Sequence, residues 1–400
     1  MKPIVLTLTN FFLPGFRGGG PIRSLQALGK ALSDEFDFRI VTADHDYGDH
    51  SPYPNMVYRR WKEVEAVQVQ YLPPPPKHWK ELFRVLKNGH YDVLYLNDFF
   101  SPHWSIWPLF LLRAKLIPRR RVLVSPRGQF MPGALAIRAS KKVCYLFMAK
   151  QLGFFSDITW HATNEVEAAE IRGFFGKNAS ILTAPVLPTV KVAPRDVPDR
   201  LNRFTQRQPL KLIFVSRISP KKNLSFAIRV LRRLSIPIDF DIFGPVDDRA
   251  YWESVKGSLV SLPPNIRATY KGELPYQEAQ DIYSNYCALL FPTLGENFGH
   301  VIYEALASGC LPIISNTTPW LDLGIRKCGW VLPVNEETAF EKALEELNDL
   351  LDTEFYEMRS NARKYAAEYL ALSGAAELNR AIFRSLCKIT QTVRVNPKVS

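Results

Sequence analysis

Residues 288–314 read ALLFPTLGENFGHVIYEALASGCLPII. Two short apolar runs, at 286–291 and 311–314, enclose a glycine-containing loop and a stretch at 299–308 with helical spacing of its apolar residues. Short apolar runs joined by a helix are typical of neighbouring parallel strands with a helical crossover. The stretch therefore predicts a βαβ unit and an α/β fold.

The same alternation extends over the whole chain and predicts two successive doubly wound sheets. A polar, proline-dotted stretch at 186–209 has no sustained period and is typical of an interdomain linker. We therefore expect an α/β fold with two Rossmann-like domains, residues 1–190 and residues 208–371, facing each other across a cleft. Strands are expected at 3–9, 36–42, 66–72, 92–97, 120–125, 157–161, 179–184, 210–215, 238–243, 266–271, 286–291, 311–314 and 329–332. Helices are expected near 21–34, 79–88, 103–116, 134–153, 163–175, 222–234, 248–261, 275–284, 299–308, 336–350, 354–371 and 374–390.

Composition excludes several classes of protein. The chain has 400 residues, 46% of them hydrophobic and 22% charged, which is ordinary for a globular protein. The longest apolar run, Ile106 to Leu112, is far shorter than the ~20 residues of a membrane-spanning helix. The start, MKPIVLTLTN, predicts a strand rather than a signal peptide. Five cysteines without a CxxC pair support neither a disulfide framework nor a zinc site, so we expect a protein of the reducing cytoplasm.

Positive charge is concentrated in the first half of the chain. The net charge is +12, and residues 1–200 carry 27 basic and 17 acidic side chains. Residues 99–156 contain no acidic residue, and aromatic side chains alternate there with basic ones. This pattern favours an anionic membrane surface as partner, with a hydrophobic core and a solvated rim of charge as the alternative. Nucleic acid is a poorer explanation, because no binding motif accompanies the charge. The basic residues are Arg113, Lys115, Arg119, Arg120, Arg121, Arg127, Arg138, Lys141, Lys142 and Lys150.

Two glutamates flank the start of the helix expected at 299–308. Glu296 lies in the preceding loop and Glu304 within the helix, about 12 Å further along at ~1.5 Å per residue. The amides of Phe298, Gly299 and His300 lie between them. Two carboxylates that accept hydroxyl groups, on either side of an anion site, suit a nucleotide sugar. The alternative, two ordinary surface glutamates, is weakened by the apolar neighbours of Glu304.

A glycine-rich loop follows the first expected strand in LTLTNFFLPGFRGGGPIRSLQ. Gly19 and Gly20 precede Pro21 at the start of a helix, where backbone can approach an anion closely. The loop lacks the GxGxxG pattern of dinucleotide sites. Contact with a diphosphate and a flexible turn remain equally open.

Two cations follow the first strand of the second half, in LIFVSRISPKKN. Arg217 and Lys222 lie on the loop that leaves this strand, and Asn223 can cap the next helix. Cations at such a position can bind phosphate oxygens. Solvated loop charge is the alternative.

The segment ENFGHVIYEALASG resembles the E-x7-E signature of the retaining glycosyltransferases of family 4, which have the two-domain GT-B fold. Four further segments fit the same family in order: the GGP loop, SPRGQFMPGALAIRASKK, WHATNEVEAAEIR and DIFGP. The resemblance implies that Glu304 binds the donor ribose and that Arg217 and Lys222 bind the diphosphate. Gly19 and Gly20 would approach the phosphates from the other domain. Glu296, with the amides of Phe298, Gly299 and His300, would meet the donor sugar and its phosphate.

The resemblance also implies that no metal or other cofactor is needed, because cations and a helix terminus neutralise the diphosphate. Asp247 and Asp248 are then expected at a helix start. The chain departs from the family at Asn97 and Arg127, where members often carry histidines. Asn97 and the nearby His103 are acceptor-side candidates, and Arg127 is, with Glu296, a catalytic candidate that would contact an anionic group. A helix at 372–392 would cross back onto the first domain.

The resemblance implies a retaining hexosyltransferase that uses a UDP- or GDP-sugar and a lipid-linked glycan acceptor. It would act in cell-surface polysaccharide synthesis, peripherally on the inner face of a bacterial cytoplasmic membrane. Two alternatives remain: a nucleotide-sugar epimerase on the same fold, and a non-catalytic subunit that binds nucleotide or glycan.

Overall fold

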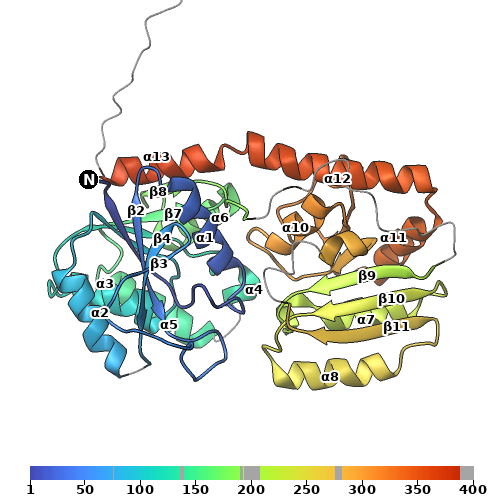
Figure 1. Ribbon diagram of the computed structural model, residues 1–400, viewed down its shortest axis with the longest axis horizontal. Coiled ribbons are helices and arrows are strands. Elements are labelled where there is room, and N and C mark those ends of the chain that lie inside the picture. Colours follow the sequence, from blue (N-terminus) through green and yellow to red (C-terminus); the bar gives the residue numbers. More distant parts are fainter. Residues whose placement is uncertain (75, 136–138, 190–191, 193–207, 275–281, 388–400) are drawn as a thin grey trace, which may run out of the picture.

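A computed structural model describes residues 1–74, 76–135, 139–189, 192, 208–274 and 282–387. The N-terminal sheet has the strand order β3-β4-β2-β1-β5-β6-β7-β8, and all neighbours are parallel except β3 and β4. Helices connect most of the parallel strands (Figure 1), whereas the segment from β2 to β4 contains β3 instead. The strands are β1 (Ile4–Leu8), β2 (Asp37–Ala43), β3 (Lys62–Val64), β4 (Val67–Leu72), β5 (Val93–Leu96), β6 (Arg121–Val124), β7 (Ile158–Ala162) and β8 (Ile181–Thr183). The helices are α1 (Gly20–Leu32), α2 (Lys77–Asn88), the π-helical turn η1 (Pro102–Ile106), α3 (Trp107–Arg113), α4 (Pro132–Leu135), α5 (Ala139–Gln151) and α6 (Glu165–Phe175).

The C-terminal sheet has the strand order β11-β10-β9-β12-β13-β14, and its strands are all parallel. The strands are β9 (Leu210–Val215), β10 (Ile238–Phe243), β11 (Ile266–Gly272), β12 (Ala288–Phe291), β13 (Leu311–Ser315) and β14 (Trp330–Leu332). The helices are α7 (Leu224–Arg232), α8 (Arg249–Val260), α10 (His300–Ser308), α11 (Glu337–Asp349), α12 (Asp352–Leu372) and α13 (Ala375–Cys387), with short 3-10 turns η3 (Pro220–Lys222) and η4 (Tyr283–Asn285).

Both sheets reverse their strand order at one point. β1 pairs with β2 on one side and β5 on the other, and β9 pairs with β10 and β12 in the same way. Ligands of open α/β sheets bind outside the carboxyl ends of the strands at such a switch point. The topology therefore places one binding crevice in each domain, and the two domains lie side by side (Figure 1).

The central strands are buried on both faces. Every residue of β5, β12 and β13 is buried. Strands covered by helices on both sides have no solvent face, which explains their continuous apolar sequences. The fold class expected from the sequence, two doubly wound Rossmann-like domains, is confirmed.

The last two helices cover both domains. α12 packs on α10 of the C-terminal domain, and α13 packs on α1 of the N-terminal domain (Figure 1). Phe383 of α13 is fully buried and contacts Phe36 and Phe38, with ring centroids 5.8 and 5.3 Å away. The crossing helix expected at 372–392 is thus α13, and residues 388–392 lie outside the described part of the chain.

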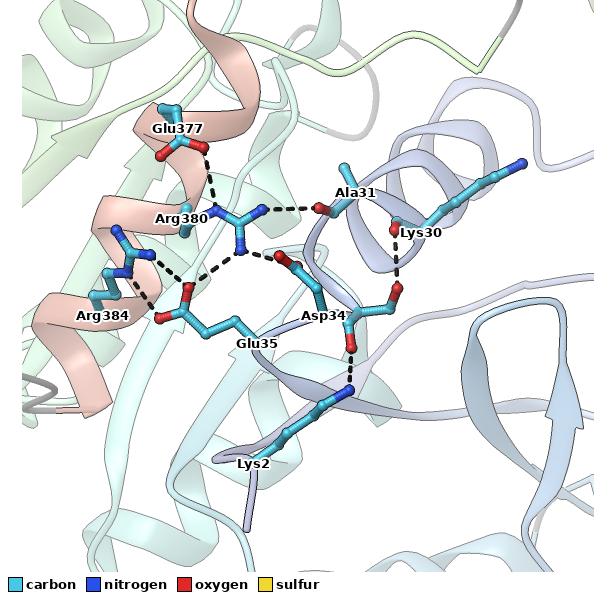
Figure 2. A network of polar contacts seen from close by, with 9 residues as sticks. Lys2, Lys30, Ala31, Asp34, Glu35, Glu377, Arg380 and Arg384 are labelled. Atoms are coloured by element: carbon cyan, nitrogen blue, oxygen red, sulfur yellow. Dashed lines mark hydrogen bonds and ion pairs between the residues drawn. The ribbon is translucent and has the colours of Figure 1, made fainter. Parts of the chain in front are cut away.

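Ion pairs hold α13 on the end of α1 (Figure 2). Arg384 binds Glu35 through two hydrogen bonds of 2.7 Å. Arg380 donates to Asp34 at 2.9 Å, to Glu35 at 3.2 Å and to the Ala31 carbonyl at 3.2 Å. Hydrogen bonds from Arg384, and then from Arg380, lower the pKa of Glu35. Burial alone would raise this pKa, but the hydrogen bonds and charges of the two arginines outweigh it.

Local structure differs from the sequence prediction at several places. The helix expected at 103–116 is divided into η1 and α3, with Pro108 in the first turn of α3. The helix expected at 134–153 corresponds to α4 and α5, and strand β3 was not expected. Most of the expected linker, and residues 275–281 of an expected helix, lie outside the described residues.

Candidate active site

One cleft of about 440 Å³ lies between the two domains. Most of its described lining comes from loops that follow the strands of both sheets, and α1, α5 and the start of α10 supply the rest. These loops follow the carboxyl ends of the strands, so the cleft unites the two crevices predicted by the topology. The lining includes Gly19, Gly20, Asn97, Arg127, Arg217, Lys222, Glu296, Phe298, Gly299 and His300.

The lining of the cleft is strongly cationic. Seven of its described residues are basic and two are acidic, Asp98 and Glu296. The basic residues come from both domains. Arg17, Arg23 and Arg217 are ion-paired with acidic residues outside the lining, and the remaining positive charge favours an anionic ligand. The seven basic residues are Arg17, Arg23, Arg127, Lys142, Arg217, Lys221 and Lys222.

The glycine-rich loop is anchored within the N-terminal domain and approaches the C-terminal domain at Gly20. The amides of Phe16 and Arg17 donate to Asp46 at 2.8 and 3.0 Å. Gly19 has a φ of 70°, a conformation that glycine adopts without strain. A Cβ on Gly20 would lie 3.2 Å from Cδ2 of His300, so a larger residue would crowd the first turn of α10.

The cations after β9 lie on a short turn. Lys222 ends η3 and hydrogen-bonds to Glu296, and Arg217 forms an ion pair with Asp247 at 3.2 Å. Lys221 lies in the same lining, and burial lowers its pKa against the opposing charge of Glu296. The structure therefore brings three cations together where the sequence indicated two.

Glu296 is a largely buried carboxylate with fixed partners. It accepts from Lys222 and, at 3.0 Å, from the hydroxyl of Thr293. Burial raises its pKa, but the charges of Lys222 and Lys221 outweigh burial and hold the pKa below its usual value. Glu296 is therefore ionised at neutral pH and held in place within the lining.

Glu304 lies on the second turn of α10 and is 2% exposed. Its carboxylate forms an ion pair with Arg23 of α1 and accepts from the Tyr283 hydroxyl at 3.2 Å. Burial raises its pKa, and Arg23 and Tyr283 oppose that effect. Glu304 is buried and does not line the cleft, and the side chain of Glu296 is only 14% exposed, so neither is an ordinary surface glutamate.

His300 begins α10 and faces the N-terminal domain. Its Nε2 is 3.0 Å from the hydroxyl of Ser24. Burial lowers the pKa of His300 well below its usual value, and the charges of Arg23 and Arg127 add to this effect. His300 is therefore neutral at physiological pH. Its preceding residue, Gly299, has a φ of 80° and turns the loop into the helix.

Arg127 and Asn97 form a pair on the N-terminal wall of the cleft. Arg127 donates from Nε to Oδ1 of Asn97 at 2.8 Å and from Nη2 to the Tyr95 hydroxyl at 2.9 Å. Arg127 has a φ of 54°, which is uncommon for a residue with a side chain. Nδ2 of Asn97 is buried and has no hydrogen-bond partner among the described residues. This N–H group is therefore an unsatisfied donor that lies beneath the surface of the cleft wall.

The structure does not bring His103 into this lining. His103 lies in η1 and packs against His78 and Trp79, with ring centroids 4.5 and 4.7 Å away. Asp248 caps α8 by accepting from the amide of Tyr251 at 2.9 Å, as the expected helix start requires. Among the described residues, no group of three His, Cys, Asp or Glu side chains could hold a metal ion.

Sequence reasoning missed Arg23, Lys221 and Asn297. Arg23 lies three residues after the GGG run, and Lys221 lies beside Lys222, which the sequence indicated as a cation for phosphate. Asn297 hydrogen-bonds through its carbonyl to Asn164 at 3.3 Å and through its side chain to Thr163 at 3.1 Å. These are contacts between the domains, and spacing along the chain gives no sign of them.

Residues 200–369 match the family model described as glycosyl transferases group 1. No curated protein matches the sequence. Many solved structures share the fold at low sequence identity, including the three that follow. Sucrose-phosphate synthase from Thermosynechococcus elongatus has a TM-score of 0.70 at 17% identity, over 97% of this chain and 100% of that one. HepE from Anabaena, in complex with UDP-glucose, has a TM-score of 0.69 at 15% sequence identity, and the match covers 96% of this chain and 100% of that one. WaaG, a glycosyltransferase involved in lipopolysaccharide biosynthesis, has a TM-score of 0.62 at 13% sequence identity, and the match covers 96% of this chain and 99% of that one. The C-terminal part of the chain thus matches a glycosyltransferase family model, and the chain as a whole shares its two-domain fold with these structures.

Proposed function

We propose that the protein transfers a hexose from a UDP- or GDP-sugar to a hydroxyl group of a lipid-linked glycan, with retention of anomeric configuration. The observation that carries the proposal is the cleft between the domains, in which seven cations and the start of α10 surround a space of about 440 Å³. Cations and helix N-termini bind diphosphates. HepE, which shares the fold, was crystallised with UDP-glucose and with UDP.

Arg217, Lys221 and Lys222 bind the diphosphate in this proposal, with the amides at the start of α10. Glu304 binds the ribose hydroxyls, and the backbone of Gly19 and Gly20 approaches the phosphates from the opposite wall. These cations stabilise the negative charge that develops on the leaving diphosphate, so no metal is required.

Glu296 orients the sugar by accepting hydrogen bonds from its hydroxyl groups. Its ion pair with Lys222 and its bond from Thr293 hold the carboxylate and favour this role over nucleophilic attack. The bond from the anomeric carbon to the phosphate oxygen breaks, and the acceptor oxygen bonds to that carbon from the same face. The acceptor proton passes to the departing phosphate oxygen.

Asn97 and Arg127 contact the acceptor or an anionic group of the donor. Arg127 supplies positive charge on this wall of the cleft, and its hydrogen bond to Asn97 holds the guanidinium in place. The acid-free stretch 99–156, with its ten basic residues, favours action at the inner face of the cytoplasmic membrane.

The experiment combines a panel of UDP- and GDP-sugars with a lipid-linked acceptor and identifies the products by NMR. Transfer that retains the donor's anomeric configuration and persists in EDTA supports the proposal. Inversion would refute retention, and loss of activity in EDTA would refute metal independence. A new sugar nucleotide formed without acceptor would indicate the epimerase, and binding without transfer or hydrolysis would indicate the non-catalytic subunit.

A further inference from the structure

Exposed apolar side chains cluster on α5. Val143, Phe147 and Met148 are 63%, 66% and 54% exposed, and Leu152, just after the helix, is 54% exposed. With about 3.6 residues per turn, Val143, Cys144, Phe147 and Met148 fall on one stripe of the helix. We call these four residues the apolar stripe. Such a stripe on a helix normally faces a core or another apolar phase.

A groove of about 570 Å³ runs beside the stripe. Apolar residues make up most of its described lining, including Ile106, Cys144, Met148 and Phe154. Phe154 also contacts Phe110 of α3, which is 42% exposed, with ring centroids 6.4 Å apart. The apolar surface therefore continues from α5 toward α3.

A basic hollow adjoins this apolar surface. It has a volume of about 800 Å³, lies at the amino ends of β5, β6 and β7, and shares Phe154 with the groove. Asp92 and Asp157 are the acidic residues in its described lining. Its basic residues are Arg113, Lys115, Arg119, Arg120 and Arg121.

The orientation of α5 connects this surface with the active site. Lys142, near its start, lines the cleft between the domains, whereas Gly153 and Phe154, just after its end, line the basic hollow. Helical spacing places Lys141 and Lys150 at the two borders of the apolar stripe. Cations that border an apolar helical face are typical of helices that lie in a membrane interface.

A second copy of the chain is a poorer occupant of this surface. A symmetric dimer through α5 would bring two acid-free stretches together, and their like charges would repel. An anionic leaflet complements both the charge and the apolar stripe. Among the described residues, no helix is long and apolar enough to cross a membrane.

We propose that α5 lies in the interface of an anionic bilayer, with Val143, Phe147 and Met148 inserted among the acyl chains. The basic residues of the hollow bind the head groups. The cleft then opens beside the leaflet, where a lipid-linked acceptor is accessible. This proposal rests on the proposed function, because it specifies how the enzyme binds the membrane. Its test measures membrane binding rather than sugar transfer, so the two proposals can fail independently.

The test is cosedimentation of the full-length protein with vesicles of phosphatidylcholine alone and of phosphatidylcholine with phosphatidylglycerol. We expect strong binding to the anionic vesicles at low salt and a weaker but measurable remainder at high salt, because insertion does not depend on charge. The double variant F147S/M148S should weaken partitioning by about tenfold or more. The matched control V260S/I325S removes two apolar side chains that are each 88% exposed on the C-terminal domain, and should bind like the wild type.

Cys144 offers a direct readout of insertion. It is exposed on the stripe, whereas Cys287, Cys310 and Cys328 are buried. An environment-sensitive fluorophore on Cys144 should shift its emission to the blue with anionic vesicles in a C387S background. No shift, equal binding of F147S/M148S and wild type, or complete loss of binding at high salt would overturn the proposal. Formation of a dimer that F147S/M148S abolishes would also overturn it.

Discussion

Lys222→Ala removes one of the cations proposed to bind the donor diphosphate. Lys222 and its partner Glu296 are only 15% and 14% exposed, so the substitution acts in a largely desolvated site. Two unit charges 4 Å apart interact by about 4 kcal/mol at an effective dielectric constant of about 20. Truncation of one partner of a buried charge pair costs about 2–5 kcal/mol in binding. Because Arg217 and Lys221 remain, we expect about 2–3 kcal/mol, or about 30- to 140-fold weaker affinity.

Calorimetric titration with UDP and GDP measures this loss on the nucleotide that the wild type binds. Lys256→Ala is the matched control, because Lys256 is an exposed cation of the same domain, paired with Glu253 at 2.8 Å. Thermal unfolding of each variant separates loss of affinity from loss of fold. If Lys222→Ala is folded and binds the nucleotide as tightly as Lys256→Ala does, the proposed diphosphate site is misplaced.

Glu304→Ala should weaken binding of the bare nucleotide, because its proposed partner is ribose, whereas Glu296→Ala should leave nucleotide affinity nearly intact and lower kcat by about tenfold or more. Calorimetry and initial rates test this pair, and the opposite pattern would reverse the two assignments. Acid should weaken the attachment of α13, because the pKa of Glu35 is lower in the folded state than in the unfolded state. The ionised carboxylate therefore stabilises the fold above the unfolded pKa of about 4.3, and this stabilisation is lost as the pH falls through the folded pKa. When Tm is measured as a function of pH, Arg384→Met should lose less stability in acid than the wild type does. The same dependence of Tm on pH in both proteins would contradict this account.

Much of the fold could be predicted from the sequence, because parallel strands buried on both faces have continuous apolar sequences. The residues of β12 and β13, for example, are apolar or small and are all buried. Several residues that line the cleft could also be predicted from the sequence. Glu296, Lys222 and Gly20, for example, follow predicted strands at the ends where ligands bind. Topology converts such positions along the chain into proximity in space.

Contacts between the domains could not be predicted in this way. The ion pair of Arg23 with Glu304 joins residues 281 positions apart, and neither sequence segment indicates the other. The cap of α7 was misjudged for a related reason. Asn223 precedes that helix, but its side chain makes no cap and donates instead to the Pro292 carbonyl at 3.0 Å. The left-handed backbone of Arg127 likewise has no signal in residue type.

The position of α13 affects how the chain can fold during synthesis. Domains usually fold in the order in which they leave the ribosome. Here the N-terminal core includes Ile382 and Phe383, which are made after the entire C-terminal domain. The first domain to be synthesised therefore completes its core last, and a fragment cut at the linker would expose the apolar surface that α13 covers. Nascent N-terminal domains must keep that surface from aggregating until the final helix arrives.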